Sequence, residues 1–98
     1  MTILDRLTGL ASPAAVLRRA IKLADSGKAA EAFPLMAKAA RAGIVDAEYR
    51  VARCYLEGTG VPPSRMEGAR WLLRAANHGS ADALALLAAL YVLSLIHI

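Results

Sequence analysis

Residues that commonly act as catalysts or metal ligands are few in this sequence and far apart. The histidines are His78 and His97, and Cys54 is the single cysteine. A metal site needs several nitrogen, sulfur or carboxylate ligands at short spacing, and neither histidine has a second His or Cys near it. No pair of carboxylates marks a catalytic site either. We therefore expect no metal, no cofactor and no enzymatic activity.

Each residue that could do chemistry has a simpler structural interpretation. His78 precedes Gly79 at the predicted end of a helix, where a partly cationic ring suits the helix dipole. Cys54 is expected to be a small core residue; a lone cysteine forms no intramolecular disulfide and is compatible with a reducing compartment. Gly58-x-Gly60 resembles a phosphate loop, but it follows a helix and lacks the strand and lysine of a P-loop. We interpret it as a turn.

The stretch from Gly58 to Ser64 joins two alanine-rich helical patterns into one hairpin. Gly58 and Gly60 allow the positive φ that ends a helix. Two prolines then keep the connection extended, because a residue before proline avoids the α region. Ser64 followed by Glu67 has the spacing of a capping box and predicts the start of the next helix.

Apolar residues recur at helical spacing along the rest of the chain and predict five helices and no strands. Pro34 lies inside the second pattern and predicts a kink or a late helix start. Asp46 is expected to cap the third helix, and Asp82 is expected to begin the fifth. The predicted helices cover about 13–25, 28–42, 47–56, 64–77 and the residues from 82 onward. In the fifth helix, the residues expected to face inward are Ala83, Leu87, Ala88 and Tyr91.

The sequence repeats itself after a shift of 36 positions. Gly43 then falls on Gly79, Asp46-Ala47 falls on Asp82-Ala83, and Tyr55 falls on Tyr91. A fixed period of this length is typical of helical repeat arrays, in which hairpins stack and share one continuous core.

The repeated residues resemble the Sel1-like repeat, a relative of the tetratricopeptide repeats. Three departures from its pattern are Ser64 in place of Asp, Gly68 in place of Ala and Leu72 in place of Tyr. Gly68 inside a helix costs roughly 1 kcal/mol relative to Ala. The resemblance implies an all-α solenoid of antiparallel hairpins that serves as a scaffold or adaptor for partner proteins, without catalysis. The matching residues are Ala47, Val51, Ala52, Tyr55, Gly58, Gly60, Val61, Gly68, Trp71, Ala75, Ala76 and Gly79.

One helical-repeat domain is expected over residues 1–92, with about two and a half hairpins. Residues 1–12 form an amphipathic lead that offers a cap for the first unit. The first hairpin, at 13–42, has the shorter tetratricopeptide spacing. The best-matching repeat lies at 46–79, and 82–92 begin the next repeat.

The last residues depart from the repeat pattern. Leu93 to Ile98 reads as the conceptual translation of a transposon-end sequencing adapter. On that interpretation 93–98 is a non-native tail, and further repeats are expected after residue 92. The alternative, a genuine hydrophobic C-terminus, stays open.

The expected binding surface is the concave groove, which the first helix of each hairpin lines in related helical repeats. An aromatic residue and an arginine on one helix face suit a binding hot spot. The simpler alternative is that Arg53 is solvated and Tyr49 packs. Counted from the inward-facing residues, the groove positions are Leu17, Ile21, Tyr49, Arg53, Ala85 and Ala89.

Charge and hydropathy narrow the partner class. The net charge is +4 and the arginines are spread over every helix, so we expect no nucleic-acid partner. The uncharged run from Ala83 to Ile98 is shorter than the ~20 apolar residues of a membrane span, so no membrane association is expected. The N-terminus shows no secretory signal, which favours the cytoplasm.

The main functional hypothesis is a protein–protein interaction scaffold that binds a peptide or helix of a partner protein. One alternative is a regulatory or targeting segment of a larger enzyme or envelope protein. The other is a membrane-associated protein that uses the C-terminal apolar run.

Overall fold

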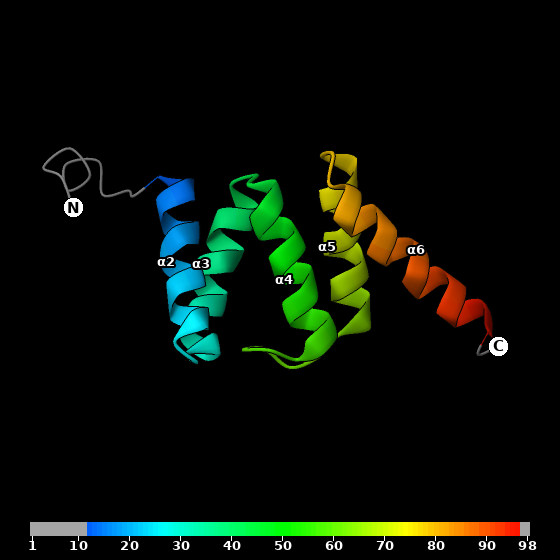
Figure 1. Cartoon of the computed structure of the whole chain (residues 1–98), viewed down its shortest axis with the longest axis horizontal. Helices are drawn as coiled ribbons and strands as arrows, with labels where there is room; N and C mark the ends of the chain where they lie inside the picture. The colour runs from blue at the N-terminus through cyan, green and yellow to red at the C-terminus, as the bar shows by residue number, and fades with distance from the viewer. Residues whose placement is uncertain (1–11, 97–98) are drawn as a thin grey trace, which may run out of the picture.

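The computed structural model describes residues 12–96, so the predicted lead at 1–11 lies outside the described residues. The described part holds five helices and no strand: α2 (Pro13–Asp25), α3 (Ala29–Arg41), α4 (Val45–Glu57), α5 (Arg65–Asn77) and α6 (Ala81–Ile96). They form an open array with extents of 56 × 27 × 17 Å (Figure 1). The predicted all-α arrangement of antiparallel hairpins is confirmed.

The helices pack mainly on their neighbours in the chain, and this packing gives two adjoining cores. One core lies among α2, α3 and α4, and the other among α4, α5 and α6. Trp71 of α5 packs against both cores and so joins them. Alanine is the commonest buried residue, which allows the helix backbones to approach closely but buries little area per residue.

The helix starts agree with the predictions in part. The Ser12 hydroxyl accepts a hydrogen bond from the Ala15 amide at 3.1 Å and caps α2. Asp46 does not cap α4: the helix starts at Val45, so the carboxylate lies in the first turn, where it suits the helix dipole. Asp82 likewise lies in the first turn of α6.

Helix α6 begins at Ala81, one residue before the predicted start at Asp82. A serine caps it: the Ser80 hydroxyl accepts a hydrogen bond from the Ala83 amide at 3.1 Å.

Helix α3 is continuous through Pro34, so the predicted late start is wrong. The proline is exposed, whereas Ala32 and Met36 on either side of it are buried. Packing of this buried face outweighs the backbone hydrogen bond that a proline removes. Phe33 also contacts Tyr55 of α4 edge to face, with ring centroids 5.3 Å apart, and this contact holds the two hairpins together.

The turn between α4 and α5 has the predicted glycine conformations. Gly58 ends α4 with a φ of 70°, and Gly60 has a φ of 77°. A methyl group on Gly60 would collide with the carbonyl group of Ala29, at the start of α3. The turn therefore fits closely against the preceding hairpin, and glycine is required there for space as well as for backbone angle.

Only half of the predicted capping box forms at the start of α5. The Ser64 hydroxyl accepts a hydrogen bond from the Glu67 amide at 3.2 Å. The Ser64 amide donates to the Tyr55 carbonyl at 2.9 Å, which ties the turn to α4. The Glu67 carboxylate binds Arg70 instead, at 2.9 Å.

Gly68 lies where α5 approaches α4 most closely. A Cβ atom there would lie 2.6 Å from Leu56 Cδ2 and 3.3 Å from the Ala52 carbonyl oxygen. The departure from alanine in the repeat pattern therefore has a steric reason, which offsets the helix-propensity cost of a mid-helix glycine.

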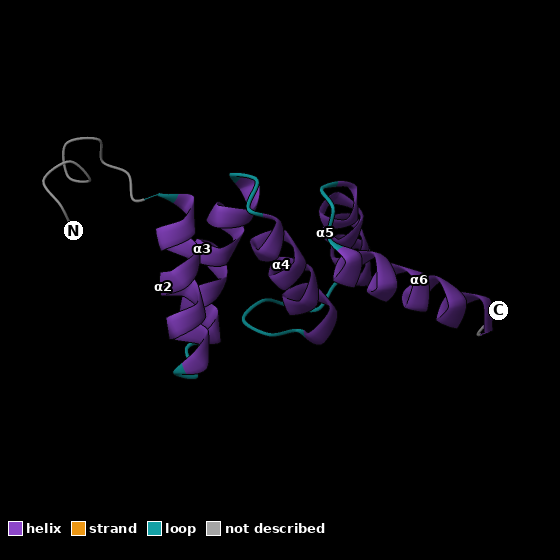
Figure 2. Ribbon diagram, turned by 45° about the horizontal axis from the view of Figure 1, so that its top comes forward, coloured by secondary structure: helices purple, strands orange, loops and turns teal. Residues whose placement is uncertain are grey.

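Helix α6 is only partly covered, and its far end lies clear of the other helices in both views (Figures 1 and 2). Ala83 is buried and Leu87 is half-buried, as predicted. Ala88 and Tyr91 are exposed, which contradicts the prediction, because no described helix packs on that side of α6. Among the residues described, the exposed apolar side chains of α6 include Leu84, Tyr91, Val92 and Leu93.

The helix continues to Ile96 through residues that were assigned to the non-native tail. Residues 97–98 lie outside the described residues. The non-native origin of the tail and the repeat boundaries stay predictions. Over the described range 12–96, no helix combines the length and the apolar character that a membrane crossing requires.

Candidate functional site

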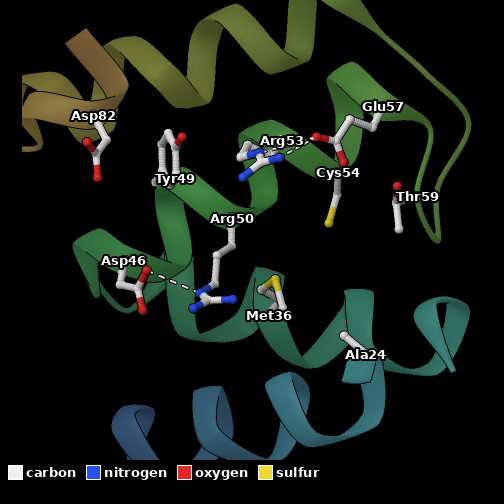
Figure 3. Close-up of a pocket in the computed structure, with 10 residues that line it drawn as sticks. All are labelled: Ala24, Met36, Asp46, Tyr49, Arg50, Arg53, Cys54, Glu57, Thr59 and Asp82. Atoms are coloured by element: carbon white, nitrogen blue, oxygen red, sulfur yellow. Dashed lines mark hydrogen bonds and ion pairs between the residues drawn. The ribbon is translucent and has the colours of Figure 1, made fainter. Parts of the chain in front are cut away.

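Tyr49 and Arg53 lie one turn apart on α4 and line the same hollow (Figure 3). The hollow has a volume of about 380 Å³, which is room for side chains of a partner. We call it the charged hollow, because five of its residues are ionisable acids or arginines. It is lined by Ala24, Met36, Asp46, Tyr49, Arg50, Arg53, Cys54, Glu57, Thr59 and Asp82.

A second hollow lies on the other side of the same two residues, between α4 and α6. We call it the apolar hollow, because Leu56, Leu86 and Leu90 line it together with Tyr49, Arg53 and Glu57. Tyr49, Arg53 and Glu57 border both hollows. We call the first two residues the Tyr49–Arg53 ridge.

Both arginines of the charged hollow are paired with an acid one turn away. Arg50 Nε lies 3.1 Å from Asp46 Oδ1. Arg53 Nη2 and Nε lie 2.8 and 3.2 Å from Glu57 Oε1. The hydrogen bond and the charge of Glu57 raise the pKa of Arg53 above its already high usual value. The guanidinium group of Arg53 still has donors that this pairing leaves unused.

Cys54 borders the charged hollow but also packs against the first core. Burial, and then the charge of Glu57, raise the pKa of its thiol, so the thiol stays protonated near neutral pH. Its environment is therefore that of a packing residue. The described residues hold no group of three or more His, Cys, Asp or Glu able to hold a metal ion.

The other predicted groove residues do not join the Tyr49–Arg53 ridge. Leu17 is 7% exposed within the first core, so it cannot form part of an exposed wall. Ile21 is half-buried and lines a separate hollow on α2. Ala85 and Ala89 are exposed, but Leu86 and Leu90 are the α6 residues that line the apolar hollow.

A network around one buried carboxylate links α4 and α5, and it was not predicted. Glu48 is completely buried, and its carboxylate accepts a hydrogen bond from Arg74 Nε at 2.9 Å. His78 Nδ1 lies 2.8 and 3.0 Å from the two carboxylate oxygens. Arg74 also lies over the Trp71 ring, 5.2 Å from its centroid. His78 caps the end of α5 as expected, but its partner was missed.

The sequence does hold a signal for this network. Glu48 sits between Ala47 and Val51, two apolar residues that helical spacing places on the inward face. A charge at an inward-facing helix position requires a partner, because burying an unpaired carboxylate is costly.

The fold and the site define a helical-repeat protein of the α-solenoid class, in which stacked hairpins form a surface for other molecules. A sequence model of the Sel1 repeat matches residues 45–80. The crystal structure of a Sel1 repeat protein from Oxalobacter formigenes matches 85% of this chain with 30% identity and a TM-score of 0.78. The chain therefore contains a Sel1 repeat at residues 45–80 and is similar in fold to a Sel1 repeat protein.

This chain spans 36% of the length of the Oxalobacter protein. No curated protein sequence matches it. Sel1 repeats are in general protein–protein interaction modules, which agrees with the class of function that was predicted.

Proposed function

We propose that this chain is a scaffold that binds a segment of a partner protein across the Tyr49–Arg53 ridge, without catalysis. The observation that carries the proposal is the ridge itself, which separates a charged hollow from an apolar hollow. Tyr and Arg are the residue types that most often dominate a protein interface. The ring of Tyr49 supplies rigid contact area, and Arg53 has free donors for carbonyl groups or side chains of a bound segment.

The alternative is a regulatory or targeting segment of a larger protein. The length of the Oxalobacter relative supports a longer array, and a helix equivalent to α5 after α6 would extend the binding face. In either case we place the protein in the cytoplasm, which the single, protonated thiol supports. Neither nucleic acid nor membrane is part of the proposal.

The test compares two ridge variants with a matched control. Once a partner is identified by affinity capture, Tyr49→Ala and Arg53→Ala should each weaken binding by at least ~1 kcal/mol, measured by calorimetry. The control is Arg70→Ala, because Arg70 is also exposed and also paired with a glutamate on its own helix. Circular dichroism must show that all three variants keep their helices.

An unchanged affinity for both ridge variants would overturn the proposal. So would a loss of binding with Arg70→Ala that equals the loss with Arg53→Ala. In that case Tyr49 is a packing residue and Arg53 a solvated one.

A further inference from the structure

We propose that the partner segment is basic, and that it places a Lys or Arg side chain at the acidic end of the charged hollow and an apolar side chain in the apolar hollow. This inference rests on the proposed function, because it specifies the ligand of the same ridge. It proposes that the charged hollow selects a positively charged partner side chain, whereas Arg53 alone would favour a carboxylate.

The balance of paired and unpaired charges carries the argument. The charged hollow holds three carboxylates and two guanidinium groups. Arg50 and Arg53 are already neutralised by Asp46 and Glu57. Asp82 lies at the N-terminal dipole of α6 but makes no ion pair with any residue that the structure describes, so among the carboxylates of the hollow it is the one without a charged side-chain partner.

The position of Asp82 makes it accessible to a bound segment. It is exposed in the first turn of α6, and Asp46 occupies the corresponding place in α4. Figure 3 shows both aspartates on the same side of the hollow, with Tyr49 next to Asp82. A cation bound there would meet the unpaired carboxylate of Asp82, and the nearby Tyr49 ring adds a cation–π attraction.

The rest of the molecular surface has the opposite charge, which makes this site distinctive. The chain carries a net charge of +4, and exposed basic residues lie on helices α2, α3 and α5. A basic segment is therefore repelled by most of the surface and attracted only where carboxylates outnumber arginines. Such an arrangement favours selectivity over affinity, because like charges oppose binding elsewhere.

The apolar hollow sets the second requirement. Leu56, Leu86 and Leu90 give it three aliphatic side chains, with Tyr49 at its border. Its only charged lining residues, Arg53 and Glu57, are paired with each other. An apolar side chain is therefore the group that fits this hollow at the least desolvation cost.

The test uses two pools of eight-residue peptides, acetylated and amidated, that share one leucine and differ only in Lys against Glu at a second, scanned position. Each pool is titrated into the ¹⁵N-labelled chain, and amide shifts are followed by NMR. The lysine pool should shift the amides of Tyr49, Arg53 and Asp82 at lower peptide concentration than the glutamate pool. Added salt should reduce the difference, because exposed charges are screened.

Two variants locate the cation. Asp82→Asn should weaken binding of the lysine pool about two- to fivefold, the range of an exposed ion pair. Asp25→Asn is the matched control: it makes the same change on α2, in a hollow outside the ridge, and should leave binding unchanged.

The outcomes separate the two proposals. Equal or stronger binding of the glutamate pool at the ridge would overturn the basic-partner inference and leave the proposed function standing. Equal effects of Asp82→Asn and Asp25→Asn would also overturn the inference, because the affinity for the lysine pool would then come from non-specific electrostatic attraction to the chain. Absence of shifts at Tyr49 and Arg53 with both pools, or shifts confined to α3 and α5, would overturn both proposals.

Discussion

Helices α4 and α6 occupy the same place in successive repeats, yet equivalent positions on the two helices differ in residue type and in burial. Glu48 of α4 is 0% exposed, whereas Leu84, at the equivalent position 36 residues later, is 60% exposed. Tyr55 is half-buried, whereas its equivalent Tyr91 is 70% exposed. A charged residue is thus inside and an apolar residue outside at one and the same repeat position.

The difference comes from the next helix. Helix α5 covers that face of α4 and brings Arg74 and His78 to the Glu48 carboxylate. Within the described residues, nothing equivalent covers α6. Burial in a solenoid is therefore a property of two neighbouring repeats, and the side chain at one position does not determine it.

The largest expected effect comes from removing the two polar partners of the buried Glu48 carboxylate. The double variant Arg74→Met/His78→Leu should lose about 3 kcal/mol of unfolding free energy, since it leaves a buried carboxylate without partners. Adding Glu48→Leu, which copies α6, should restore most of that loss. Urea unfolding measures all three proteins, and the double and triple variants both lack the Arg74–Trp71 contact, so their difference isolates the carboxylate.

A triple variant no more stable than the double variant would show that lost packing, and not the unpaired charge, causes the loss. Burial of Glu48 would then be incidental to the pairing of α4 with α5.

The second effect concerns the turn that holds α5 on α4. Gly60→Ala should cost at least ~1 kcal/mol more than Gly27→Ala, because both strain a left-handed backbone but only the first also forces a methyl group onto another helix. Gly27 has a φ of 80° and no atom within 4 Å of an added Cβ, so it is the matched control. Equal losses in urea unfolding would mean that the turn moves freely and does not hold the hairpin closed.

The third effect exploits the uncovered face of α6. We expect the 98-residue chain to self-associate through Leu84 and Tyr91, because contiguous exposed apolar side chains favour association. Tyr91→Glu should raise the dissociation constant at least about tenfold, a 1.4 kcal/mol change, measured by sedimentation equilibrium. Ala85→Glu adds the same charge on another side of α6 and should change it less.

Sedimentation of the unmodified chain as a clean monomer would contradict this expectation. A monomer that also melts cooperatively above ~65 °C, beyond ordinary mesophilic domains, would further show that the uncovered face of α6 does not leave the chain marginally stable.

The smallest effect is the ionisation of Cys54. Its raised pKa means that alkylation by iodoacetamide should accelerate at higher pH in the folded chain than in urea. The sign for stability follows: the unfolded thiol ionises first, so the contribution of Cys54 is complete below the unfolded pKa of ~8.5 and declines as pH rises above it. If alkylation of the folded chain accelerates at the same pH as in urea, or at a lower pH, then the pKa of the folded thiol is not raised and Cys54 is a reactive cysteine.

The sequence predicted best what depends on a few adjacent residues. The bounds of α2 were predicted from Ser12 and Pro13, and the end of α4 from Gly58, because caps and positive φ are local properties. The period of 36 predicted the stacking of hairpins. The cap predicted at Asp46 and the helix start predicted at Asp82 were misplaced by the small offset that separates a cap from the first turn.

Contacts between distant residues were predicted poorly. Glu48 meets Arg74 and His78 from 26 and 30 residues away, and no local pattern encodes that meeting. The candidate site was predicted only at its centre: Tyr49 and Arg53 share a hollow, whereas Leu17 turns into the core. Which side of a helix faces a groove depends on helix rotation, and helical spacing alone does not fix it.

The pairing of each helix mainly with its neighbours in the chain also shapes how the molecule comes apart. Among the described residues, the extensive packing is between helices adjacent in the chain, so loss of α6 removes few interactions from α2 and α3. The free energy of local opening should rise from α6 toward the joint between the two hairpins, where Phe33 meets Tyr55. Amide hydrogens would then exchange with solvent earliest in α6 and progressively later toward that joint.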